Sequence, residues 1–140
     1  MRHSSVTNLA LVTITETTII ADLVWSLVLS NGKKWSVDDT VLALDLYKTP
    51  EVKHSRNAPK VQEDARLTKR SPDSIALKLC NFLAVETSGT KGCVHTARLD
   101  RQVWEEFDGR DHELHVEAER IRRILRGRWK EEHGRPSNHQ

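Results

Sequence analysis

Residues 70–82 constrain the fold most strongly, because they read as a short helix whose start is fixed. Ser71 can accept a hydrogen bond from a first-turn N–H, and Pro72 stands where a missing N–H costs nothing. Apolar residues then recur at helical spacing. They are Ile75, Leu79 and Phe82, and Ala76, Leu77, Cys80 and Leu83 widen the apolar face. The pattern predicts a helix, ending near Val85, that packs this face on a core.

The same stretch leaves one narrow polar stripe, made of Ser74, Lys78 and Asn81 at positions i, i+4 and i+7. A hydroxyl, an ammonium and an amide in one line can contact phosphates and base edges in a DNA major groove. A plainer interpretation, which periodicity alone favours, is a core helix with a solvated stripe. Asn81 could instead cap the helix end or bind the following loop. Both main interpretations expect the stripe to point outward.

Signals for other helices lie on both sides. Trp35, Ser36 and the acids after them predict a helix that ends near Lys48, and Pro59 opens a second helix to about Leu67. Two more helices follow, over residues 99–107 and from 110 to about 127. The fold is therefore predicted to be all-α, a small helical bundle containing a helix-turn-helix unit. Its expected core is Trp35, Leu44, Tyr47, Ile75, Leu79, Phe82, Trp104 and Phe107.

The chain divides into three zones. Residues 1–33 are poor in charge and rich in β-branched side chains, with a possible strand at 12–20, and we expect them to be an extension outside the domain. Residues 34–126 form the helical domain. Residues 127–140 read as a polar tail or linker. The Arg-rich stretch 120–128 could bind nucleic acid or membrane, although a linker to a partner domain is the favoured interpretation.

Bulk properties narrow the function classes. The net charge is only +2, so a nucleic-acid interpretation must rest on local charge. Basic residues gather before residue 72, and an ordinary solvated basic surface is the equal alternative. Glu16 and Asp22 interrupt the apolar run near the N-terminus, so we expect no membrane span and a cytoplasmic protein. Cys80 and Cys93 are the only cysteines, and we expect free thiols with no disulfide and no zinc set.

No arrangement of residues suggests catalysis, and no cofactor is expected. His112, His115 and Glu119 stand at i, i+3 and i+7 of the last predicted helix. That spacing could hold a metal ion, but further ligands are not evident, so a solvated helix face is the favoured interpretation and no metal site is expected.

Four blocks of residues resemble a known family. Residues 35–47 begin with Trp35 and end in Ala-Leu-Asp-Leu-Tyr, and residues 70–82 read Arg-Ser-Pro-Asp-Ser-Ile-Ala-Leu-Lys-Leu-Cys-Asn-Phe. Residues 89–92 read Gly-Thr-Lys-Gly, and residues 100–107 read Asp-Arg-Gln-Val-Trp-Glu-Glu-Phe. In this order they resemble the N-terminal helical domain of bacterial HNH endonuclease-type proteins. The start at Trp35 also resembles the Myb/SANT type of three-helix unit.

The resemblance implies a DNA-binding module associated with an HNH-type restriction or defence endonuclease. An HNH site needs a His-Asn-His set on a hairpin and helix, and this chain shows none, so we do not expect it to be an enzyme as it stands. Double-stranded DNA is the expected partner, together with a nuclease module encoded separately. The alternative is a helical interaction module that docks a nuclease or another regulatory partner.

The predicted DNA contacts fall into two groups. Ser74, Lys78 and Asn81 are expected in the groove. Lys69, Arg70 and Lys91 are expected on phosphates.

Overall fold

The computed structural model describes residues 33–93 and 96–134. Over these residues the chain is all-α, without a strand, which confirms the predicted fold class. The elements are α3 (Val37–Tyr47), the 3₁₀ turn η1 (Pro50–Val52), α4 (Pro59–Thr68), α5 (Pro72–Glu86), α6 (Arg98–Glu106) and α7 (Asp111–His133). The possible strand at 12–20 lies outside the described residues.

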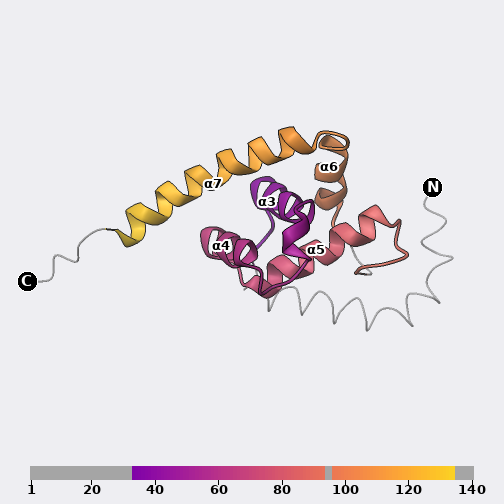
Figure 1. Ribbon diagram of the computed structural model, residues 1–140, viewed down its shortest axis with the longest axis horizontal. Helices are drawn as coiled ribbons and strands as arrows, with labels where there is room; N and C mark the ends of the chain where they lie inside the picture. The colour runs from indigo at the N-terminus through magenta and orange to yellow at the C-terminus, as the bar shows by residue number, and fades with distance from the viewer. Residues whose placement is uncertain (1–32, 94–95, 135–140) are drawn as a thin grey trace, which may run out of the picture.

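Helix α3 is the centre of the bundle. It contacts α4, α5, α6 and α7, which surround it in Figure 1. Every residue from Asp39 to Tyr47 is buried. A helix that is apolar nearly all round can be stable only when neighbours cover it on every side. The sequence of α3 therefore requires the other helices to pack around it.

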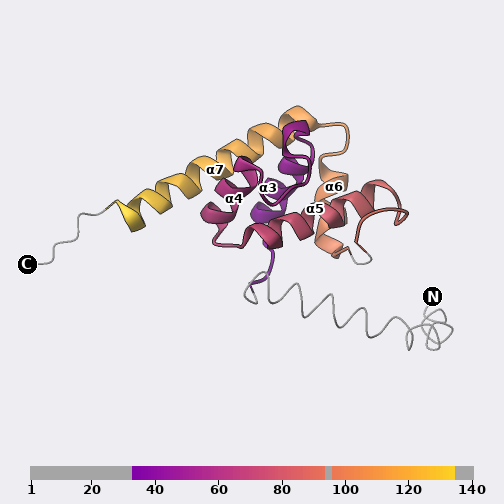
Figure 2. The ribbon, with the colours of Figure 1, turned by 60° about the horizontal axis from the view of Figure 1, so that its bottom comes forward.

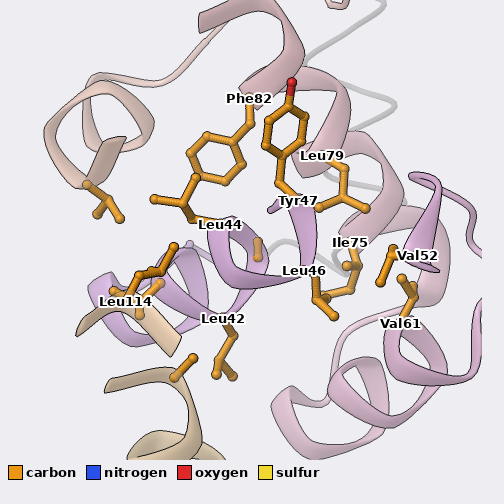
Figure 3. Packing of buried hydrophobic residues seen from close by; sticks show 14 of the residues in the cluster. Leu42, Leu44, Leu46, Tyr47, Val52, Val61, Ile75, Leu79, Phe82 and Leu114 are labelled. Atoms are coloured by element: carbon orange, nitrogen blue, oxygen red, sulfur yellow. The ribbon is translucent and has the colours of Figure 1, made fainter. Parts of the chain in front are cut away.

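The core is one continuous cluster drawn from all of these helices (Figure 3). Tyr47 connects two parts of it, with ring centroids 6.0 Å from Phe82 and 5.9 Å from Trp104. All eight expected core residues belong to the cluster or pack on it. Leu44, Tyr47, Ile75, Leu79 and Phe82 are buried, whereas Trp35, Trp104 and Phe107 are partly buried at its edge.

The predicted helix starts are confirmed. The hydroxyl of Ser36 accepts a hydrogen bond from the Asp39 N–H at 3.0 Å, and that of Ser71 accepts one from the Ser74 N–H at 3.0 Å. Between α4 and α5 the chain needs only three residues, 69–71. Lys69 takes a left-handed conformation there, with φ at 59°, and the Arg70 N–H then caps the carbonyl of Ala65 at 2.9 Å. The result is the expected helix-turn-helix connection.

Helix α7 is longer than predicted. It continues past Gly127 to His133, so that residues 127–133 are helix rather than a polar tail. In Figure 2 this C-terminal part projects beyond the other helices. An exposed glycine costs a helix only about 1 kcal/mol relative to alanine. Stacking of the Trp129 and His133 rings, with centroids 4.5 Å apart, offsets part of that cost.

The prediction of free thiols is wrong, because Cys80 and Cys93 form a disulfide with Cα atoms 5.4 Å apart. The chain after α5 turns back onto that helix, and the Cys93 N–H donates to the Cys80 carbonyl at 3.2 Å. Gly92 permits this close approach, since a Cβ there would lie 2.5 Å from the Cys80 carbonyl oxygen. The sequence could not show the pairing, because it depends on the path of the loop.

None of the helices described here is both long and apolar enough to cross a membrane.

Candidate nucleic-acid interface

The polar stripe of α5 faces the interior. Lys78 is 4% exposed and Ser74 is 3% exposed. The ammonium of Lys78 donates to Asp100 Oδ1 at 2.7 Å and lies 4.6 Å from the centroid of the Trp35 ring. Burial lowers the pKa of Lys78, and the carboxylate of Asp100 opposes that shift. The prediction that these side chains point outward is therefore wrong, and Ser74 and Lys78 are not free to enter a DNA groove.

Asn81 takes part in the same arrangement. Its amide donates to Asp100 Oδ2 at 3.3 Å, and the same oxygen accepts the Ala97 N–H at 3.0 Å, at the start of α6. Asp100 is fully buried, and its carboxylate accepts hydrogen bonds from α5 and from the start of α6. Asn81 therefore has a structural role, but it binds Asp100 of α6 and, among the described residues, neither caps the helix end nor binds the following loop, as the alternative expected.

Arg70 is also an interior residue. Its guanidinium donates to Asp39 at 3.0 Å and to the backbone carbonyls of Lys33 and Lys34 at 3.1 and 2.6 Å. It lies 4.0 Å from the centroid of the Trp35 ring. Burial lowers its pKa, against the favourable charge of Asp39. Arg70 therefore fixes the segment before α3 to the α4–α5 turn, and its predicted contact with phosphate is wrong for this conformation.

The surface of α5 that does reach solvent carries no cation. Its partly exposed side chains include Ala76, Leu77 and Cys80, which the sequence had placed on the buried face. Lys78 is the only basic residue of α5. A recognition helix needs exposed donors or acceptors for base edges. Helix α5 lacks a basic group to supply them, so it is a poor candidate for insertion into the major groove.

Two of the predicted phosphate contacts remain exposed, at different places. Lys91 lies in the loop after α5. Lys69 lies at the end of α4 and lines a groove between the segment before α3, the end of α4 and the last turns of α7. Its ammonium is 3.1 Å from Glu132, and both side chains are largely exposed. Such an exposed pair is weak and can exchange partners with a phosphate.

Among the described residues that line this groove, four are basic and three are acidic, and we call it the basic groove. Four cations line it, namely Lys33, Lys34, Lys69 and Arg128. Its volume is about 360 Å³. Trp129 forms part of the wall, with the Arg66 guanidinium 5.9 Å from its ring centroid. Three acids face these cations: the exposed Asp38 and Glu132, and the buried Asp39. The Lys33 ammonium is 4.0 Å from Asp39 and donates to the Thr68 carbonyl.

Sequence reasoning missed three of the four cations. Lys33 and Lys34 were placed at a domain boundary, and Arg128 was placed in a tail. The Arg-rich stretch 120–128 gave a partial signal for Arg128. Nothing in the sequence alone brings residue 33 beside residue 128, because that contact depends on the packing of α7 against α3 and α4.

Charge is segregated over the described surface. The turn between α6 and α7 exposes mostly acids, among them Glu105, Glu106, Asp108, Asp111 and Glu113. The end formed by α4 and the C-terminal half of α7 exposes mostly cations, and Figure 2 shows it away from α6. Although the net charge is only +2, the exposed charge is therefore distributed unevenly, with an acidic end and a basic end.

Comparison with known proteins gives no relative: no family model, no curated protein and no solved structure matches this chain. The resemblance to the HNH-associated domain accordingly stays a prediction.

Proposed function

We propose that this chain binds double-stranded DNA through the basic groove, with Lys33, Lys34, Lys69 and Arg128 on phosphates. The observation that carries the proposal is the meeting of four cations from three separate parts of the chain in one groove. Electrostatic contacts to phosphates supply most of the affinity of sequence-tolerant DNA binding. An exposed surface of α5 without basic groups favours such tolerant binding over direct base readout.

The family resemblance supports DNA as the ligand of the basic groove and suggests what the binding is for. In the proposed role the chain targets DNA for an HNH-type nuclease module. The residues of the resemblance that the structure buries, such as Arg70, Lys78 and Asp100, then serve the fold of the module rather than the contact itself.

The test is binding of a fluorescent DNA duplex, followed by anisotropy between 50 and 200 mM salt. Four phosphate contacts predict that log K falls against log salt with a slope of about −3.6. The variant Lys34→Ala/Arg128→Ala removes two cations for which the described residues show no ion pair. It should flatten the slope by about 2 and weaken binding to all duplexes equally.

A matched control removes the same charge elsewhere. Arg98 and Arg101 are exposed on α6, outside the basic groove. The variant Arg98→Ala/Arg101→Ala should leave the slope nearly unchanged. Equal loss in both variants, or no binding of the parent chain at about 50 mM salt, would refute the proposal. The interaction-module alternative would then remain.

A further inference from the structure

Three side chains from two helices meet where α3 packs against α7. Asp45 stands near the end of α3, and His115 and Glu119 are one turn apart on α7. One nitrogen or oxygen from each lies within 4.8 Å of the others. His115 Nδ1 is 3.1 Å from Asp45 Oδ1. The sequence offered His112, His115 and Glu119 as possible ligands. The structure leaves His112 outside the cluster and brings in Asp45 from a distant helix.

The charge around this cluster is not balanced. Arg122 donates to Asp45 at 2.7 Å, to Glu119 at 3.0 Å and to the buried Asp64 at 2.8 Å. Arg126 is 2.6 Å from Glu63 and 3.8 Å from Glu119. Four carboxylates thus face two guanidinium groups, which leaves an excess of two negative charges among these ion pairs. A divalent cation would supply the missing charge.

Two carboxylate oxygens are held less tightly than the others. Arg122 binds Oδ2 of Asp45 and Oε1 of Glu119. Among the described residues, the remaining oxygens contact only His115, 3.1 Å from Asp45 Oδ1, and the more distant Arg126, 3.8 Å from Glu119 Oε2. In tetrahedral geometry, metal–ligand bonds of about 2.0–2.2 Å place neighbouring ligand atoms about 3.3–3.6 Å apart. The 3.1 Å between His115 Nδ1 and Asp45 Oδ1 is slightly shorter, so a small side-chain movement would admit the ion. Hydrogen bonds that orient ligating carboxylates are a regular part of metal sites, and Arg122 provides them here.

We propose that Asp45, His115 and Glu119 form a binding site for a divalent transition-metal ion, with Zn²⁺ as the best fit. One imidazole with two carboxylates suits zinc and its neighbours, whereas Mg²⁺ and Ca²⁺ prefer sites made of oxygen alone. The His115 side chain is 57% exposed, so the ion can enter from solvent. Bound metal would join α3 to α7. This site is separate from the basic groove, and neither proposal depends on the other.

The test is calorimetric titration of zinc chloride into the chelator-free 140-residue chain, with thermal unfolding as a second readout. One equivalent of Zn²⁺ should bind in the micromolar range and raise the unfolding temperature, because the ligands are assembled only in the folded state. His115→Ala and Glu119→Gln change exposed or half-exposed side chains, so the fold should persist. Each should weaken binding by about tenfold or more.

His112→Ala is the control, because His112 is exposed on the same helix, outside the cluster. It should bind Zn²⁺ as the parent chain does. Three results would overturn the proposal: no saturable binding by the parent chain, unchanged binding by His115→Ala, or an equal loss in His112→Ala.

Discussion

At the scale of single residues, Lys78 shows how a polar side chain can belong to the core. Its apolar stem crosses the interior, and its ammonium is paired with Asp100 and covered by the Trp35 ring. Burying a charged group costs free energy of folding unless the charge is paired. Removing one partner of a buried pair destabilises the fold strongly, because the other charge stays buried without a partner. Lys78 and Asp100 are therefore a unit, and removing one leaves the other charge without a partner.

The variant Lys78→Ala should lower the free energy of unfolding by about 3–5 kcal/mol, measured by urea denaturation. The reason is the uncompensated carboxylate of the fully buried Asp100. Lys91→Ala, which removes an exposed lysine 13 residues further along the chain, should change it by less than about 0.5 kcal/mol. Equal effects of the two substitutions would mean that the buried pair contributes nothing to the fold.

Tyr47 offers a spectroscopic test of burial, because it is the only tyrosine in the chain. Burial raises the pKa of its hydroxyl above the ordinary value, and the adjacent Glu86 raises that pKa further. At pH 11 the folded chain should show little tyrosinate absorbance near 295 nm, whereas the urea-unfolded chain should show nearly the full signal. Full ionisation in the folded chain would show that Tyr47 is open to solvent.

The same shift makes stability depend on pH. A raised pKa in the folded state means that the unfolded chain releases the Tyr47 proton first, so stability is complete below pH 10 and falls as the pH rises. Above pH 10 the loss should approach about 1.4 kcal/mol per pH unit relative to Tyr47→Phe, which cannot ionise. Parallel pH profiles for the two chains would contradict this.

At the scale of elements, the loop after α5 can pack against that helix because of one glycine in particular, Gly92. Gly92 and Gly89 have similar positive φ angles, 89° and 84°. A Cβ on Gly92 would lie 2.5–2.6 Å from backbone atoms of Cys80 and Ala84, whereas one on Gly89 would meet nothing within 4 Å. A side chain at either position would therefore be strained by the positive φ angle, but only at Gly92 would its Cβ also clash with backbone atoms of α5.

Gly89→Ala should therefore lower the free energy of unfolding by about 1 kcal/mol, the cost of placing a side chain at positive φ. Gly92→Ala should cost a further 1–3 kcal/mol or so, because the backbone of α5 cannot yield as a flexible side chain would. Denaturation curves of both variants, with the disulfide intact, give the comparison. If the two variants lost equal free energy of unfolding, the loop could not be packed tightly on α5 at Gly92.

At the scale of the whole molecule, three sets of buried ion pairs connect the helices in the part of the chain that the structure describes. Asp39 and Arg70 join α3 to the α4–α5 turn, Lys78 and Asp100 join α5 to α6, and Arg122 joins α7 to α3 and α4. Burial alone would lower the pKa of Arg122, but its bonds to Asp64 and Asp45 outweigh that and raise it. Each pair forms in only one arrangement of the helices, so together they favour a single packing.

Surface charge is segregated at this scale as well. Among residues 33–93 and 96–134, seven charged side chains lie in the interior: Asp39, Asp45, Asp64, Arg70, Lys78, Asp100 and Arg122. What remains outside is acidic around the α6–α7 turn and basic around α4 and the end of α7. Such a field steers an anionic polymer toward one end of the molecule. The basic groove and the DNA proposal belong to this scale.

The sequence by itself determined the helices, because each depends on neighbours in the chain. The caps at Ser36 and Ser71, the turn at 69–71 and the spacing of the apolar residues that α5 buries are all local signals, and the structure confirms them. Helix-length errors were small for the same reason, apart from α7, whose last turns are supported by ring stacking that the sequence pattern did not indicate.

Only the tertiary structure decided which way the helices face. The stripe of Ser74, Lys78 and Asn81 looks solvated when α5 is considered alone, and it becomes interior once Asp100 supplies a countercharge from α6. Likewise, the basic groove and the Asp45–His115–Glu119 cluster exist only where distant segments meet. The physical reason is that pairing decides the cost of burying a charge, and the partner's position is a property of the packed chain.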